Sequence, residues 1–122
     1  MKKGLGLLSL VLFVTVSLSC ASGSPREVAR RFLTALVSLD IEEARRYAAR
    51  QTLPSLDLLQ AFVALVPEGE RSALSVRSFR LEDVVEEGDR IRVDYLIEGE
   101  GRESLYLVKE GGEWKVLWPM EW

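Results

Sequence analysis

The spacing of apolar residues divides the folded part of the chain into a helical half and a strand half. Over residues 24–37 the apolar positions recur three and four apart, after a serine that is followed by Pro25. This pattern predicts an amphipathic helix with a capped start. Asp40 opens a second segment of the same kind, in which Tyr47 and Ala48 are expected to turn inward. We therefore predict two short helices at the start of the domain.

A third helix is predicted over residues 55–66, where nearly every position is apolar. The proline in residues 52–54 interrupts the pattern and separates this helix from the second one. A helix that is apolar on more than one face is either enclosed by the fold or in contact with a molecule outside it. Residues 67–70 are predicted to form a turn, after which the period changes from helical to alternating.

The remaining residues alternate between apolar and polar, which predicts an antiparallel meander of four strands. Gly111 and Gly112 indicate a two-residue hairpin turn, and residues 99–101 indicate a three-residue loop. The predicted cross-strand pairs are Leu107 with Val116, Leu105 with Trp118, Tyr95 with Leu105, and Val93 with Leu107. All of these pairs place apolar side chains on one face of the sheet.

The first of the four strands is less regular than the others. Leu74 and Val76 share one parity, while Phe79, Leu81 and Val85 share the other. A bulge near Arg77 and Ser78 would keep both sets on the inner face, and a bulge bends the strand that contains it. We therefore predict an α+β fold in which three N-terminal helices pack on the hollow side of a curved four-stranded antiparallel sheet.

The start of the chain has a different character from the rest. Two lysines precede an apolar run over residues 5–18, and small residues lead up to Cys20, the single cysteine. A basic start, an apolar stretch shorter than the roughly 20 residues that span a bilayer, and a small-residue end are typical of a secretory leader. We expect residues 1–19 to be removed and residues 25–122 to form one domain.

The residues Val16-Ser17-Leu18-Ser19-Cys20 resemble the lipobox of bacterial lipoproteins. The resemblance implies cleavage before Cys20, acyl chains such as palmitate on that residue, and a tether to the membrane over residues 20–24. It also implies a place in the cell envelope, on the extracytoplasmic side of a bacterial membrane. Ala21 after the cysteine favours the outer membrane in a cell with two membranes. The alternative is a plain secreted protein in which Cys20 is incidental.

Composition excludes several kinds of function. Removal of the leader leaves 103 of the 122 residues, with two of the 16 basic residues lost and all 19 acidic ones kept, so the net charge is about −5. This charge argues against binding of nucleic acid or anionic lipid through bulk attraction. The chain has no histidine and one cysteine, which excludes histidine triads, internal disulfides and zinc sites of the usual kinds. We expect no metal and no cofactor.

A family resemblance rests on the first helix and on the order of elements. The residues that carry it are Pro25, Val28, Phe32, Leu33, Ala35, Leu36, Leu39, Asp40 and Ala44. With a curved antiparallel sheet that ends in a strand such as residues 113–116, they are similar to the nuclear-transport-factor-2-like superfamily. Within it, the chain looks most like small bacterial lipoproteins whose domain has no assigned function. The resemblance implies a cone whose hollow binds small apolar molecules, carries acid–base chemistry as in ketosteroid isomerase and scytalone dehydratase, or pairs through its sheet.

Asp83 is the candidate residue for acid–base chemistry. A three-residue turn at residues 87–89 would place its carboxylate opposite Val93 on the helix-facing side, near Tyr95. The alternative is that Asp83 lies in water within the acidic run of residues 82–87. The residues predicted to line a pocket are Phe62, Leu81, Val93, Tyr95, Leu105 and Trp118.

The outer face of the predicted sheet is only half polar. The residues that interrupt it are Leu96, Tyr106, Val108 and Leu117, and the predicted registers bring them together. They predict a homodimer or a contact with another envelope protein. The sequence thus predicts an envelope lipoprotein that binds a small apolar ligand in its hollow or a protein at its sheet. A cofactor-free isomerase or dehydratase that uses Asp83 and Tyr95 is the alternative.

Overall fold

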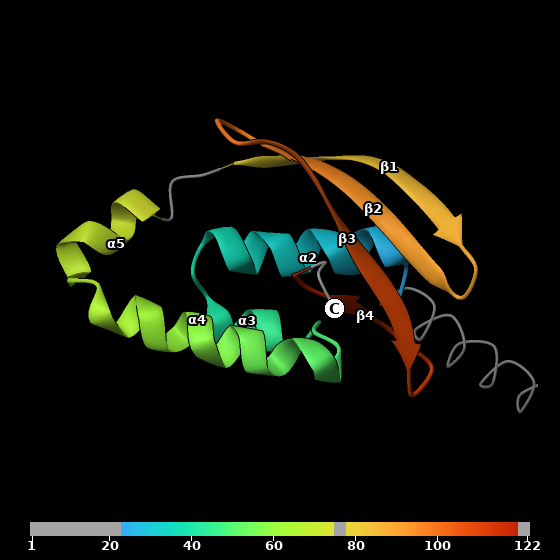
Figure 1. The fold of residues 1–122 in the computed structure, drawn as a ribbon, viewed down its shortest axis with the longest axis horizontal. Helices are drawn as coiled ribbons and strands as arrows, with labels where there is room; N and C mark the ends of the chain where they lie inside the picture. Colours follow the sequence, from blue (N-terminus) through green and yellow to red (C-terminus); the bar gives the residue numbers. More distant parts are fainter. Residues whose placement is uncertain (1–22, 75–77, 120–122) are drawn as a thin grey trace, which may run out of the picture.

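Helices come first along the chain and a four-stranded antiparallel sheet follows in the computed structural model, which describes residues 23–74 and 78–119 (Figure 1). The helical elements are α2 (Pro25–Val37), α3 (Ile41–Arg45), the 3-10 helix η1 (Arg50–Thr52), α4 (Leu53–Leu65) and α5 (Glu68–Leu74). The strands, in spatial order, are β1 (Phe79–Glu87), β2 (Arg90–Ile97), β3 (Gly101–Glu110) and β4 (Glu113–Leu117). The predicted α+β class is confirmed, although the helical elements are more numerous than predicted. The predicted leader and Cys20 lie outside the described residues.

The first helix begins where the sequence predicts, because Ser24 caps it. The Ser24 hydroxyl oxygen accepts a hydrogen bond from the backbone N–H of Glu27 at 3.2 Å. Pro25 occupies the first turn, where a helix needs no N–H donor. One side of α2 is buried, and the exposed side carries Arg30 and Arg31, which both pair with Glu27.

The second helix is shorter than predicted. α3 ends at Arg45, and the prediction that Tyr47 and Ala48 lie in this helix is wrong. The chain there runs beside β4 instead: the Tyr47 carbonyl accepts from the Val116 N–H, and the Ala49 N–H donates to the Val116 carbonyl, both at 2.8 Å. An edge strand has unpaired backbone groups, and this segment satisfies those of Val116 in β4.

Thr52 joins the end of η1 to the last strand. Its side chain is fully buried, and its hydroxyl donates to the Val116 carbonyl at 2.7 Å and accepts from the Trp118 N–H at 3.0 Å. α4 follows directly, with Pro54 in its first turn. The break predicted at residues 52–54 is therefore a change from 3-10 helix to α-helix.

A further helix replaces the turn that was predicted at residues 67–70. Two glutamates in the first turn of α5 stabilise its start through the helix dipole. Leu74 therefore belongs to a helix, and the prediction that it lies in the first strand is wrong. Val76 and Arg77 lie outside the described residues.

The register of the sheet agrees with the sequence at one turn and differs at another. Leu107 pairs with Val116 as predicted, and the ladder ends one residue before Trp118. Between β2 and β3 the prediction is wrong: Val93 pairs with Leu105, and Tyr95 pairs with Glu103. The loop lies one residue earlier than predicted, because Gly101, at φ 102°, already belongs to β3. The pairing shifts by two residues, so every side chain keeps its face.

The bulge in β1 also lies elsewhere than predicted. Leu81 pairs with Tyr95 and Val84 pairs with Val93, which leaves Glu82 and Asp83 as the irregular residues. Because an extra residue reverses the alternation, the register places Val84 rather than Val85 on the side of Leu81, although Val84 is 41% exposed and Val85 is half-buried. The prediction that Asp83 lies opposite Val93 is therefore wrong.

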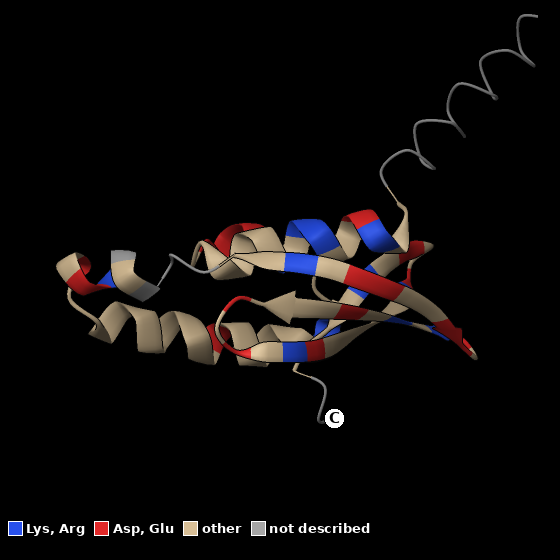
Figure 2. Ribbon diagram, turned by 90° about the horizontal axis from the view of Figure 1, so that it is seen from above, with Lys and Arg blue, Asp and Glu red and all other residues tan. Residues whose placement is uncertain are grey.

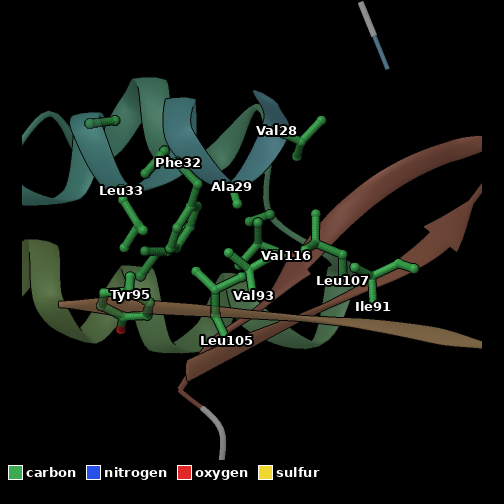
Figure 3. Packing of buried hydrophobic residues seen from close by; sticks show 14 of the residues in the cluster. Val28, Ala29, Phe32, Leu33, Ile91, Val93, Tyr95, Leu105, Leu107 and Val116 are labelled. Atoms are coloured by element: carbon green, nitrogen blue, oxygen red, sulfur yellow. The ribbon is translucent and has the colours of Figure 1, made fainter. Parts of the chain in front are cut away.

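The hydrophobic core lies between α2 and the inner face of the sheet (Figure 3). Its central buried residues are Val28, Ala29, Phe32, Leu33, Ile91, Val93, Tyr95, Leu105, Leu107 and Val116. α2 contacts all four strands, whereas α4 packs against α3 and η1. None of the helices in the described ranges is long and apolar enough to cross a membrane.

Candidate functional site

The structure does not bring the two candidate acid–base residues together in a pocket. Asp83 is exposed, in the bulge of β1. Tyr95 is 2% exposed and belongs to the core, where its ring lies beneath α2 (Figure 3). The acid–base site predicted from the sequence is therefore not formed, because the Asp83 carboxylate is exposed to solvent and the Tyr95 side chain is buried in the core.

Tyr95 is held in its neutral form. Burial raises the pKa of its hydroxyl to about 12, and the negative charge of Glu103, its hydrogen-bond partner on β3, adds to the effect. A general acid works best when its pKa is near the operating pH. The environment of Tyr95 therefore suits a packed core residue with one satisfied polar atom.

The hollow of the sheet is filled by side chains. Val93 and Leu105 are fully buried against α2, and Leu81 and Trp118 are partly buried against the same cluster. The Phe32 ring lies 6.2 Å from the Trp118 ring, centroid to centroid, within this space. Of the residues predicted to line a pocket, Phe62 stands apart, because 59% of it is exposed on α4.

The four residues predicted to form an interface on the outer face do not form one cluster. Tyr106 pairs with Leu117, but Leu117 is only 5% exposed. Val108 lies opposite Lys115, and Leu96 lies further along the sheet, opposite Arg102. The apolar area that the sequence predicted on this face is therefore interrupted by charged residues.

Paired charges occupy the middle of the outer face. Asp94 accepts a hydrogen bond from the Ser104 hydroxyl at 2.6 Å and from Arg92 Nε at 3.0 Å. These two contacts, Ser104 first, lower the pKa of Asp94, and the carboxylate in turn raises the pKa of Arg92. Arg92 also pairs with Glu87, which accepts a hydrogen bond from the Tyr106 hydroxyl at 3.1 Å. Groups that satisfy one another in this way stabilise a solvated surface.

Among the residues that the structure describes, the largest exposed apolar side chains lie on one face of α4. Leu56 and Val63 are buried, at 0% and 7% exposure, and they hold the helix to the domain. Leu58, Phe62 and Leu65 are 74%, 59% and 84% exposed. Their spacing of four and three residues places them on one side of the helix. We call these three residues the α4 patch.

The surroundings of the α4 patch are also apolar. Asp57 is the one charged residue in α4, and it pairs with Arg45 of α3 near the start of the helix. Figure 2 shows the rest of the helix without a charge, whereas α2 and the strands carry many. In both views α5 and the last turn of α4 lie at one end of the molecule, and α2 starts at the other end (Figures 1 and 2). The end of α4 therefore lies away from the point where the expected tether would join the domain.

Comparisons with known proteins found no relative of this chain. A scan against protein-family models found no family that matches the chain, and searches of curated proteins and of solved structures found no match. Within the described residues, no group of three or more acidic or cysteine side chains is placed to hold a metal ion.

Proposed function

We propose that this protein is a lipid-anchored envelope protein, tethered through Cys20, whose domain binds another protein through the α4 patch. The observation that carries the proposal is the exposure of Leu58, Phe62 and Leu65 on a helix whose opposite face is buried. Large apolar side chains that gather on one exposed face are typical of an interaction site. The order of elements, with helices before a curved antiparallel sheet, supports a nuclear-transport-factor-2-like fold as the scaffold.

The α4 patch has the size of the centre of an interface. Full burial of a leucine or phenylalanine side chain stabilises by about 1.5–3 kcal/mol, so covering the exposed parts of these three residues would contribute roughly 3–6 kcal/mol. Association opposes binding by a similar amount or more, so the patch needs a surrounding rim of contacts. A phenylalanine and two leucines at the centre of such a rim are suited to a hot spot.

The position of the patch favours a protein over a lipid as the occupant. A tether of five residues from Cys20 would hold the start of α2 close to the membrane, and α4 runs toward the opposite end of the molecule, where α5 lies (Figure 1). A small apolar ligand is less well supported, because Phe32 and Leu33 fill the hollow in which it would bind.

Photo-crosslinking in the cells that make the protein tests this proposal. A photoreactive amino acid at Leu65 should yield a discrete crosslinked species, and the same residue at Asp89, in the exposed β1–β2 turn, should not. Phe62→Asp in the Leu65 background should abolish the species without lowering the amount of protein. Equal yields at the two positions, or a yield that survives Phe62→Asp, would refute the proposed site. A crosslinked species of twice the protein's mass would identify a second copy as the partner.

The anchor is tested separately by growth with labelled fatty acid. Label should enter the wild-type protein and be absent from Cys20→Ala. Label that persists in this variant would exclude Cys20 as the acylated residue, and it would leave the binding test at the α4 patch unaffected.

A further inference from the structure

A cavity of about 490 Å³ lies at the end of the domain where α2 begins. Its walls come from the first half of α2, from the residues after α3 and from the β3–β4 turn. Figure 1 shows the start of α2 and this turn at the same end of the molecule. The volume falls within the range of small-molecule sites in proteins.

The cavity reverses the sign of the charge that the chain carries as a whole. Arg31, Arg46 and Lys115 line it, and Glu113 is the one acidic residue among its described lining residues. The described lining residues therefore carry a net charge of +2, in a chain whose net charge is −3, and each of the three cations also pairs with one carboxylate. Cations that converge from three separate elements on one hollow attract an anion there more strongly than scattered surface charges do.

The present partners of these cations are weak competitors. Arg31 Nε lies 3.2 Å from a Glu27 carboxylate oxygen, and Arg46 Nη1 lies 3.0 Å from one of Glu43. Both are exposed pairs within one helix or at its end, and pairs of this kind contribute little to stability. Lys115 Nζ donates to the Arg46 carbonyl at 2.9 Å, which fixes its ammonium group beside the arginine, and it lies 3.6 Å from a carboxylate oxygen of the exposed Glu113. The cations are thus held in place while remaining available to an incoming anion.

Two aromatic side chains complete the wall. Tyr47 and Trp114 both line the cavity and are partly buried. The Arg46 guanidinium lies 6.0 Å from the centre of the Tyr47 ring, which orients it toward the same space. Tyrosine and tryptophan are enriched where proteins meet lipid headgroups, because one side of each ring is apolar and one atom is polar. The combination suits a ligand with an anionic group and a less polar remainder.

The cavity also lies near the proposed membrane anchor, and this step rests on the proposed function. Gly23 is part of the cavity wall, and Cys20 is three residues before it in the sequence. Three extended residues span at most about 10 Å. An acylated Cys20 would therefore hold the cavity at the level of the phospholipid headgroups.

We propose that this cavity binds a phosphate group, and that the phosphate belongs to the headgroup of an anionic phospholipid in the membrane that anchors the protein. Arginine presents paired N–H donors that match phosphate oxygens, and lysine adds a point charge. Bulk charge cannot produce this binding, because the chain without its leader carries about −5 and is repelled by an anionic surface. Any attraction between the protein and an anionic membrane must therefore come from the cations that line the cavity.

The test uses the chain from residue 20 onward with Cys20→Ser, which has no acyl chain. All described core residues and the capping Ser24 lie within this chain, so its fold is retained. Co-sedimentation is measured with vesicles of phosphatidylglycerol and phosphatidylcholine in equal parts, and with phosphatidylcholine alone. Calorimetry with glycerol 3-phosphate measures binding of the soluble group.

Arg31→Gln and Arg30→Gln form the matched pair of variants. Both arginines are 50% exposed and both pair with Glu27, but Arg31 lines this cavity and Arg30 does not. We expect Arg31→Gln and Arg46→Gln each to weaken binding to the anionic vesicles on the order of tenfold, as for the loss of one charge-assisted hydrogen bond. Arg30→Gln should leave this binding within about twofold of the parent.

The outcomes separate the source of the phosphate from the existence of the site. Binding to anionic vesicles that depends on Arg31 supports a lipid headgroup. Binding of glycerol 3-phosphate alone, with the same dependence, supports a phosphate site and overturns the lipid source. Absence of both kinds of binding, or equal losses in Arg30→Gln and Arg31→Gln, overturns the proposal. Because the test protein is not acylated, failure of the anchor would leave these results unchanged.

Discussion

Two leucines of the same helix provide a sharp test of how α4 is docked. Leu56 is fully buried and Leu65 is 84% exposed. Truncation of a buried leucine removes its transfer free energy and leaves a cavity, so Leu56→Ala should destabilise the domain by about 2–5 kcal/mol. Leu65 buries only a sixth of a side chain whose full burial contributes about 1.5–3 kcal/mol, so Leu65→Ala should cost about 0.2–0.5 kcal/mol.

Urea unfolding followed by tryptophan fluorescence measures both values. The unlipidated chain with Cys20→Ser is used, and the dependence of the free energy of unfolding on urea should be the same for all variants. A loss above about 1.5 kcal/mol in Leu65→Ala would show that the domain itself covers the α4 patch. A loss below about 1 kcal/mol in Leu56→Ala would show that α4 is not docked as described.

Three further changes test the interior and the former candidate site. Tyr95 has a folded-state pKa of about 12, above the value of about 10 for an unfolded chain, so its contribution is complete below pH 10 and lost as the pH rises toward 12. Wild type should therefore lose about 2–3 kcal/mol over this interval relative to Tyr95→Phe in urea unfolding, and parallel curves would contradict the assignment. Thr52→Val removes one of the two donors to the Val116 carbonyl, which keeps the Ala49 N–H, and takes away the hydroxyl that accepts from the Trp118 N–H. It should lower the free energy of unfolding by about 1–3 kcal/mol, whereas an unchanged midpoint would contradict these hydrogen bonds. Asp83→Asn, at an exposed bulge, should change stability by less than about 0.5 kcal/mol.

The sequence predicted the elements better than it predicted their ends. The three- and four-residue spacing and the capping serine were enough to place α2, because both signals are local. α3 ends early because the chain at Tyr47 and Ala49 satisfies the backbone of Val116, which is more than sixty residues away in the sequence. A pairing between residues so far apart in the sequence produces no recognisable pattern in the residues around Tyr47.

The sequence predicted the inner and outer faces of β2 and β3 correctly, although it predicted the wrong register between them. The loop before β3 lies one residue earlier than predicted, because Gly101 adopts its positive φ inside the strand and not in the loop. The resulting shift of two residues preserved the alternation. In β1 the bulge at Glu82 and Asp83 reverses the alternation of side chains between the two faces. The prediction that Asp83 lies opposite Val93 is wrong for this reason.

The candidate surface was visible in the sequence only as two alternatives. An apolar run on more than one face of α4 is compatible with enclosure or with an external contact, and composition alone does not separate them. The distinction depends on which elements pack against the helix. α4 packs against α3 and η1, Leu56 and Val63 are buried, and Phe62 on the other side of the helix is exposed.

Cysteine labelling at the α4 patch tests the central claim most directly. In a Leu65→Cys variant, a water-soluble maleimide should react quickly with the isolated domain and much more slowly in membranes from the cells that make the protein, because a partner covers the helix there. Asp89→Cys should react equally quickly in both. Equal rates at residue 65 in the two preparations would contradict the proposed interface, and slow labelling in the isolated domain would contradict the exposure of the helix.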